Sequence, residues 1–155
     1  MAVYSHRQQG RILRLIILAG SVVTFIALFL ASPNVDLQLI GISLIAAGIL
    51  YALAIQLTNL TTVVDEASLR WWFGSGIWKK SVQLTDIASV EPVVNKWWWG
   101  WGIRYYGKGW LYCVSGLQAV EVILKSGKHI RIGTDDPQGL TEALARRLAA
   151  FAQSR

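Results

Sequence analysis

One short stretch, residues 96–110, holds most of the side chains in this sequence that could bind another molecule. It contains five of the eight tryptophans, together with two tyrosines, several glycines and three basic residues. Tryptophan and tyrosine carry an apolar ring with a polar tip and concentrate at membrane interfaces, while lysine and arginine bind phosphates. The stretch therefore predicts contact with a membrane or a partner. The candidate contact residues are Lys96, Trp97, Trp98, Trp99, Trp101, Arg104, Tyr105, Lys108 and Trp110.

Three interpretations of residues 96–110 remain open from the sequence. The rings could fill one end of a β-domain and stiffen a long loop, lie on a lipid surface, or contact a protein or ligand. Gly100 and Gly102 permit the positive φ angles that a tight loop needs. Their spacing is too weak a signal to predict a phosphate-binding loop, because no strand-to-helix transition surrounds it.

A second basic feature is the pair Lys79-Lys80, which follows Trp78 in a predicted strand. The pair is a candidate basic patch for an anionic partner. The competing explanation is a solvated strand edge, where lysines discourage edge-to-edge pairing with other chains.

Side chains that could perform catalysis or bind a metal are few and scattered. His6, His129 and the single cysteine, Cys113, do not form the clustered donor set that a zinc site needs. Cys113 lies in an alternating strand pattern that predicts a core position, and His129 is predicted to face solvent. The adjacent acids Asp135 and Asp136 are explained by capping of the helix that follows. The sequence therefore predicts no catalytic residue, no cofactor and no metal, and a protein that is not an enzyme.

Two apolar segments near the amino terminus determine where the rest of the chain lies. Residues 12–31 contain one charge, Arg14, near their start, and residues 37–57 contain none. About 20 residues at ~1.5 Å rise cover the ~30 Å hydrocarbon core of a bilayer. A soluble helical hairpin would show polar residues at every third or fourth position, and these segments do not. Residues 11–57 are therefore predicted to be a two-helix transmembrane hairpin.

Charges at the ends of the hairpin predict its orientation. Arg7, Arg11 and Arg14 precede or begin the first helix, whereas the five-residue connection carries only Asp36. The positive-inside rule then predicts a multi-pass protein of the cell membrane with both termini in the cytoplasm. A cleaved signal peptide is disfavoured because the apolar region is too long. Neither helix has a central charge, which favours an anchor over a transport pathway.

Beyond residue 57 the hydrophobic period changes from the helical value to two, which indicates strands. Residues 58–155 are predicted to form one domain of about seven antiparallel strands with a carboxy-terminal helix beginning at Pro137. Residues 1–10 are predicted to be a flexible lead. The fold class is thus an α+β membrane protein. Strands are predicted at 60–64, 69–73, 77–84, 87–94, 110–114, 119–125 and 128–133.

The net charge restricts the choice of partners. The chain of 155 residues carries a formal charge of +6, and residues 58–155 hold 12 basic and 8 acidic side chains. This modest excess without a dense basic run argues against nucleic acid as a partner and favours anionic headgroups. A single cysteine excludes an internal disulfide.

Three segments of the β-domain carry a resemblance to a known family: 84–90 (LTDIASV), 109–117 (GWLYCVSGL) and 130–137 (IRIGTDDP). With the hairpin ahead of them, they resemble the bacterial pleckstrin-homology-like family, in particular its small members with a two-helix membrane anchor. The resemblance implies a bent antiparallel barrel or sandwich capped by a carboxy-terminal helix, with a binding or scaffold role and no catalytic residues. Eukaryotic members bind phosphoinositides through basic residues of the first hairpin loop. Here that loop, 65–68, is acidic, so this property does not transfer.

Together these patterns predict a membrane-anchored, non-catalytic binding or scaffold domain on the cytoplasmic face. It would recruit a protein partner or assemble with itself as a homo-oligomer, with residues 96–110 as a contact to the lipid bilayer. The alternative is a small-molecule-sensing or enzymatic domain with its site in the same Trp- and Gly-rich stretch.

Overall fold

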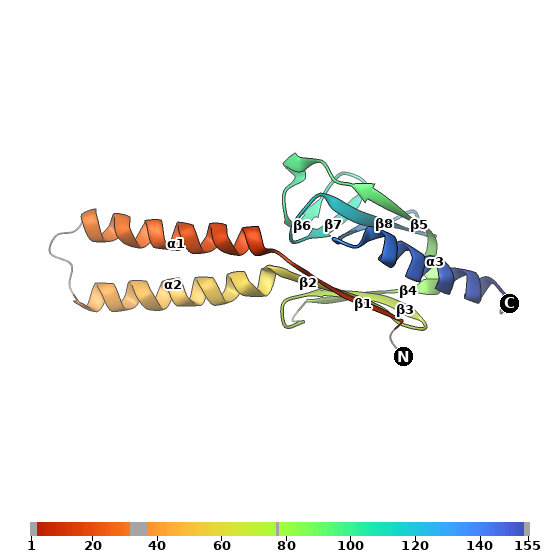
Figure 1. Ribbon diagram of the computed structural model, residues 1–155, viewed down its shortest axis with the longest axis horizontal. Helices are drawn as coiled ribbons and strands as arrows, with labels where there is room; N and C mark the ends of the chain where they lie inside the picture. The colour runs from red at the N-terminus through yellow and green to blue at the C-terminus, as the bar shows by residue number, and fades with distance from the viewer. Residues whose placement is uncertain (1–2, 32–36, 77, 154–155) are drawn as a thin grey trace.

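A computed structural model of the chain describes residues 3–31, 37–76 and 78–153. Figure 1 shows an elongated molecule in which two antiparallel helices project from one end of a β-domain. These helices, α1 (Arg11–Ala31) and α2 (Leu37–Leu57), agree with the predicted ones to within one residue.

The β-domain is built from two sheets and one long helix, α3 (Pro137–Gln153), which packs against β5 and β8. In the first sheet, in spatial order, lie β1 (Tyr4–Gln9), β2 (Asn59–Val64), β3 (Ser68–Phe73) and β4 (Lys79–Gln83). In the second lie β5 (Ile87–Val94), β8 (Gln118–Leu124), β9 (His129–Gly133), β7 (Gly109–Cys113) and β6 (Gly102–Tyr105). Short 3-10 turns, η1 (Leu84–Asp86) and η2 (Trp97–Trp99), precede and follow β5.

Alternating apolar residues of the two sheets meet in one core, which α3 completes. Burying each large apolar side chain stabilises the fold by about 1.5–3 kcal/mol. Residues of both sheets and the helix that form this core include Leu60, Val64, Leu69, Trp71, Phe73, Tyr112, Val120, Val122, Ile132, Leu140 and Leu144. The predicted α+β class with a carboxy-terminal helix is therefore confirmed.

The prediction of a flexible lead is wrong for residues 4–9. They form β1 and pair with β2 along its whole length, from Tyr4 opposite Val64 to Gln9 opposite Asn59. The strand is polar and has no apolar face to reveal it in the sequence. Backbone hydrogen bonds to β2 form it, and the buried Gln8 side chain donates to the carbonyl of Ser115 at 3.0 Å.

The prediction of about seven antiparallel strands is also wrong in its details. Nine strands are present among the described residues, because β1 and β6 arise from segments that were expected to be irregular. One pairing, between β7 and β9, is parallel. The chain reverses from β7 to β8 and again from β8 to β9, so β9 runs in the same direction as β7 when it inserts between β8 and β7.

The helices join the β-domain without an intervening linker. Strand β1 leads into α1 through Gly10, whose N–H donates to the carbonyl of Thr58 at 2.6 Å. A Cβ at Gly10 would lie within 3 Å of the carbonyl oxygens of Val114 and Thr58, so glycine is needed for this close approach. Arg14 of α1 donates to the Thr58 hydroxyl at 2.9 Å and to the Asn59 side-chain oxygen. The direction of the helices relative to the first sheet is therefore fixed.

Both helices expose large apolar side chains around their surfaces. Among the described residues, the segment Ile40–Leu57 of α2 is long and apolar enough to cross a membrane, with a mean hydropathy of 2.1 and none of it buried. Exposed apolar residues of the two helices include Ile12, Leu15, Ile16, Val22, Val23, Ile26, Leu30, Ile42, Leu44, Ile45, Ile49 and Leu50.

Candidate functional site

The tryptophan-rich segment, residues 96–110, connects β5 to β7 and contains η2 and β6. Figure 1 shows β6 and the short helical turn before it at the end of the β-domain from which α1 and α2 project. The arrangement of the two sheets thus brings the segment to the hairpin side of the domain, as a lipid contact would require.

Two of its rings are free to contact another molecule. Trp97 is 75% exposed and Trp98 is 60% exposed, and they pack edge to face with their centroids 5.8 Å apart. The Lys96 ammonium lies 5.2 Å from the Trp98 ring centroid, at cation–π distance. These three residues form an exposed aromatic and basic surface at η2.

The β6–β7 hairpin supplies the other exposed candidates. Tyr105 and Trp110 are exposed and pack edge to face at 5.8 Å. The Arg104 guanidinium is exposed, and its Nε donates to the carbonyl of Trp101 at 3.0 Å. Lys108 is exposed in the turn of this hairpin. The predicted contact residues therefore cover a broad area around η2 and β6, rather than a single pocket.

Two tryptophans of the segment are packed against the second sheet instead. The Trp101 indole donates to the carbonyl of Gly116 at 3.2 Å. The Trp99 ring lies 5.1 Å from that of Tyr106, and the Arg131 guanidinium carbon is 5.1 Å from the first ring centroid and 4.6 Å from the second. Packing and exposure, which were alternatives from the sequence, thus apply to different tryptophans.

Beneath these rings lies a buried carboxylate, Glu121, on the face of β8 opposite the core. Its side chain is 7% exposed and accepts hydrogen bonds from Arg131 Nε and Nη2, both at 3.1 Å, and from the Tyr106 hydroxyl. His129 Nδ1 lies 3.2 Å from the same carboxylate. Burial alone would raise the Glu121 pKa, but the hydrogen bonds from Arg131, Tyr106 and His129 lower it to about 2. Burial and the bond to Glu121 raise the pKa of Tyr106.

This cluster has the residue types of an acid–base site, but its electrostatics are those of an ion pair. A general acid or base works best with a pKa near the operating pH. Here Arg131 keeps the Glu121 carboxylate ionised, and its oxygens are engaged by Arg131, Tyr106 and His129. The cluster therefore fastens the tryptophan-rich segment to the second sheet.

Sequence reasoning missed this cluster. His129 was predicted to face solvent, and that prediction is wrong because its ring is half-buried beside Glu121. The available signal was the hairpin turn at 126–127, whose register places Glu121 directly opposite Arg131. Oppositely charged residues facing each other across a hairpin are a recognised stabilising pair.

The lowered Glu121 pKa predicts a specific acid sensitivity. The unfolded chain binds a proton near pH 4.5 and the folded chain only near pH 2, so the stabilisation is complete above pH 5 and is lost as the pH falls toward 2. The loss is expected to reach about 3 kcal/mol. Urea unfolding of the detergent-solubilised chain should show the gap in stability between wild type and Glu121→Gln closing over this pH interval. A gap that does not change with pH would contradict the assignment.

The remaining polar candidates have structural partners. Asp136 caps α3, because its carboxylate accepts from the Gly139 N–H at 2.9 Å, whereas Asp135 pairs with His6. Burial raises the Cys113 pKa to about 11, so the thiol is protonated at neutral pH. In the part of the chain that the structure describes, no three His, Cys, Asp or Glu residues come together in a group that could hold a metal ion.

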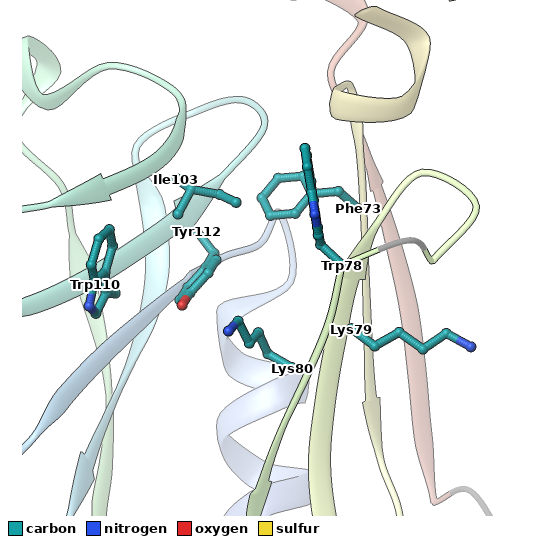
Figure 2. A pocket seen from close by; sticks show the side chains of 7 residues that line it. All are labelled: Phe73, Trp78, Lys79, Lys80, Ile103, Trp110 and Tyr112. Atoms are coloured by element: carbon teal, nitrogen blue, oxygen red, sulfur yellow. The ribbon is translucent and has the colours of Figure 1, made fainter. Parts of the chain in front are cut away.

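Two hollows lie near the base of the hairpin. The inter-sheet cleft, between β3–β4 and β6–β7, has a volume of about 490 Å³. Figure 2 shows the Lys80 side chain directed into this cleft, whereas that of Lys79, which also belongs to the lining, extends in the opposite direction. The lining residues of the cleft are Phe73, Trp78, Lys79, Lys80, Ile103, Trp110 and Tyr112. The second hollow, of about 580 Å³, is lined by Arg7, Gln9, Arg11, Ile12, Ser115, Gly116 and Asp135.

Comparison with known proteins adds no relative. No family model, no curated protein and no solved structure matches the chain. The resemblance to pleckstrin-homology-like domains therefore stays a prediction carried by the three sequence segments.

Proposed function

We propose that this chain is a two-span membrane anchor carrying a non-catalytic binding domain that is held against the bilayer surface. The observation that carries the proposal is the direct passage from apolar helices into paired strands: α1 continues β1, and α2 continues into β2. Apolar side chains are exposed around both helices, and a bilayer is the environment in which such a hairpin is stable. The hydrogen bonds at Gly10 and Arg14 then keep the domain close to the lipid.

Residues at the hairpin end of the domain suit the lipid headgroup region. Exposed Trp97 and Trp98, with Lys96 beside them, combine the apolar and cationic character that interfaces select. Arg7 and Arg11 line the hollow at the start of α1. Basic residues near the membrane surface attract anionic lipids, and each contributes about 1 kcal/mol to the binding free energy.

The same residues favour a cytoplasmic location. Arg7, Arg11 and Arg14 lie at one end of the hairpin, and the positive-inside rule assigns that end to the cytoplasm. Both termini and the β-domain would then face the cytoplasm. A domain of two sheets with a carboxy-terminal helix fits the pleckstrin-homology-like resemblance and its scaffold role. The edge strands β4 and β6 offer backbone positions to a protein partner or a second copy of the chain.

Site-directed labelling tests this topology. In membranes of an expression host, we expect the chain to resist carbonate extraction and Asp36→Cys, in the connection outside the described residues, to react with an impermeant maleimide from the external side. Ser126→Cys, in the exposed β8–β9 turn, should react only after permeabilisation. The wild type is the control, since its Cys113 is buried and should stay unlabelled. Labelling of Asp36→Cys only after permeabilisation, or release by carbonate, would overturn the proposal.

A further inference from the structure

We infer that the inter-sheet cleft binds an amphiphilic anion, a molecule with one anionic head and an apolar body, such as an anionic membrane lipid. The inference deepens the proposed function, on which it rests for the nearby bilayer as a source of such molecules. It concerns a different surface from the exposed tryptophans of η2.

The shape and lining of the cleft suit the apolar part of such a ligand. Its volume of about 490 Å³ lies within the range of small-molecule sites. Phe73 and Tyr112, which are buried, lie at its base with ring centroids 6.4 Å apart. Trp78, Ile103 and Trp110 line it as well and are exposed. Exposed apolar side chains gathered around a concave surface are typical of a binding site rather than of a solvated face.

The charge of the lining selects an anion. Two lysines and no carboxylate line the cleft. In Figure 2 the Lys80 ammonium lies within the cleft, on the side of Tyr112, whereas Lys79 extends in the opposite direction. The Lys79 ammonium instead lies 5.8 Å from the Trp72 ring. Lys80 is thus the cation that would meet a phosphate or carboxylate, with the aromatic rings beside it for the apolar body.

The position of the cleft places it within reach of lipid. The turn that follows Phe73 is bound to the junction of α2 and β2: the Gly74 N–H donates to the carbonyl of Asn59 in β2 at 2.9 Å, and the Ser75 N–H donates to Gln56 Oε1 in α2 at 2.8 Å. Figure 2 accordingly shows a turn of α2, in pale yellow, near Phe73 and Trp78. An amphiphile at the membrane surface would therefore need to move only a short way to enter.

Native mass spectrometry of the full chain in neutral maltoside micelles tests the inference with three probes: dioleoyl phosphatidylglycerol, dioleoyl phosphatidylcholine and oleate. We expect the wild type to retain an adduct with an anionic probe and to bind the zwitterionic lipid at least tenfold more weakly. Lys80→Gln should weaken the anionic adduct about tenfold, which corresponds to about 1.4 kcal/mol. Lys125→Gln, an exposed lysine of the β8–β9 turn that does not line the cleft, is the matched control and should bind as the wild type does.

A second variant, Ile103→Glu, places a carboxylate in the lining and should abolish the adduct, while near-ultraviolet circular dichroism checks that each variant is folded. Tighter binding of phosphatidylglycerol would identify the bilayer as the source of the ligand, and tighter binding of oleate a free fatty acid; both support the inference if they depend on Lys80. Equal anion binding by Lys80→Gln and wild type, or equal binding of the zwitterionic lipid, would overturn it. Because this assay uses micelles, its outcome is independent of the topology test.

Discussion

Replacing Arg131 with alanine is expected to lower the free energy of unfolding by about 3–5 kcal/mol, because it leaves a buried carboxylate without its cation. The side chains of Glu121 and Arg131 are only 7% and 14% exposed, and two hydrogen bonds of 3.1 Å join them. The Arg131 guanidinium also lies at cation–π distance from the rings of Trp99 and Tyr106. Its loss should therefore loosen residues 96–110 as well, and near-ultraviolet circular dichroism together with urea unfolding would measure both effects.

Two control variants distinguish the cost of breaking the buried ion pair from the cost of removing a charge at the surface. Arg146 pairs with Glu142 at 2.9 Å on the exposed face of α3, and Arg146→Ala should cost less than about 1 kcal/mol. The double variant Glu121→Met/Arg131→Met removes both charges and should recover most of the loss, since breaking a buried pair costs more than replacing it. An Arg131→Ala variant as stable as wild type would mean that water reaches the Glu121 carboxylate in the folded chain.

The elements that the sequence predicted well are those whose own residues show a clear pattern, either a long apolar run or one buried face. The two apolar runs produced α1 and α2 almost residue for residue. The alternation of Leu69, Trp71 and Phe73 placed β3 correctly, because one buried face is enough to mark a strand. Strand β1 has no such face, and its partner β2 follows it by about 50 residues, so no local pattern could reveal it.

The position of the candidate site in the sequence was predictable. Which of its tryptophans are exposed and which are packed was not. Composition alone identified residues 96–110, yet the separation of exposed Trp97 and Trp98 from packed Trp99 depends on Arg131, which a different strand supplies. The inter-sheet cleft was not predictable, since two strand pairs that are distant in sequence, β3–β4 and β6–β7, line it. Likewise, the sequence presents Lys79 and Lys80 as a pair, but the pleat of β4 sends neighbouring side chains to opposite faces.

A second large effect on the free energy of unfolding is expected at Trp71, which contacts Tyr112 of the cleft lining. This residue is 2% exposed and packs edge-on against Tyr112 with ring centroids 5.4 Å apart. Trp71→Ala is therefore expected to cost about 3–5 kcal/mol, the usual range for deleting a buried aromatic ring. Urea unfolding of the detergent-solubilised chain measures it, and the loss of support for Tyr112 should also weaken the amphiphile adduct.

Trp71→Phe separates the packing of the ring from the chemistry of the indole. The Trp71 Nε1 group is buried, and none of the described residues accepts its hydrogen. An unpaired buried donor costs about 1–3 kcal/mol, so phenylalanine removes that penalty while it loses part of the ring volume. The two effects oppose each other, so Trp71→Phe should lose less stability than Trp71→Ala, by at least about 1 kcal/mol. If phenylalanine proved as damaging as alanine, the indole N–H would have to be hydrogen-bonded in the folded chain, for example to a water held at the base of the cleft.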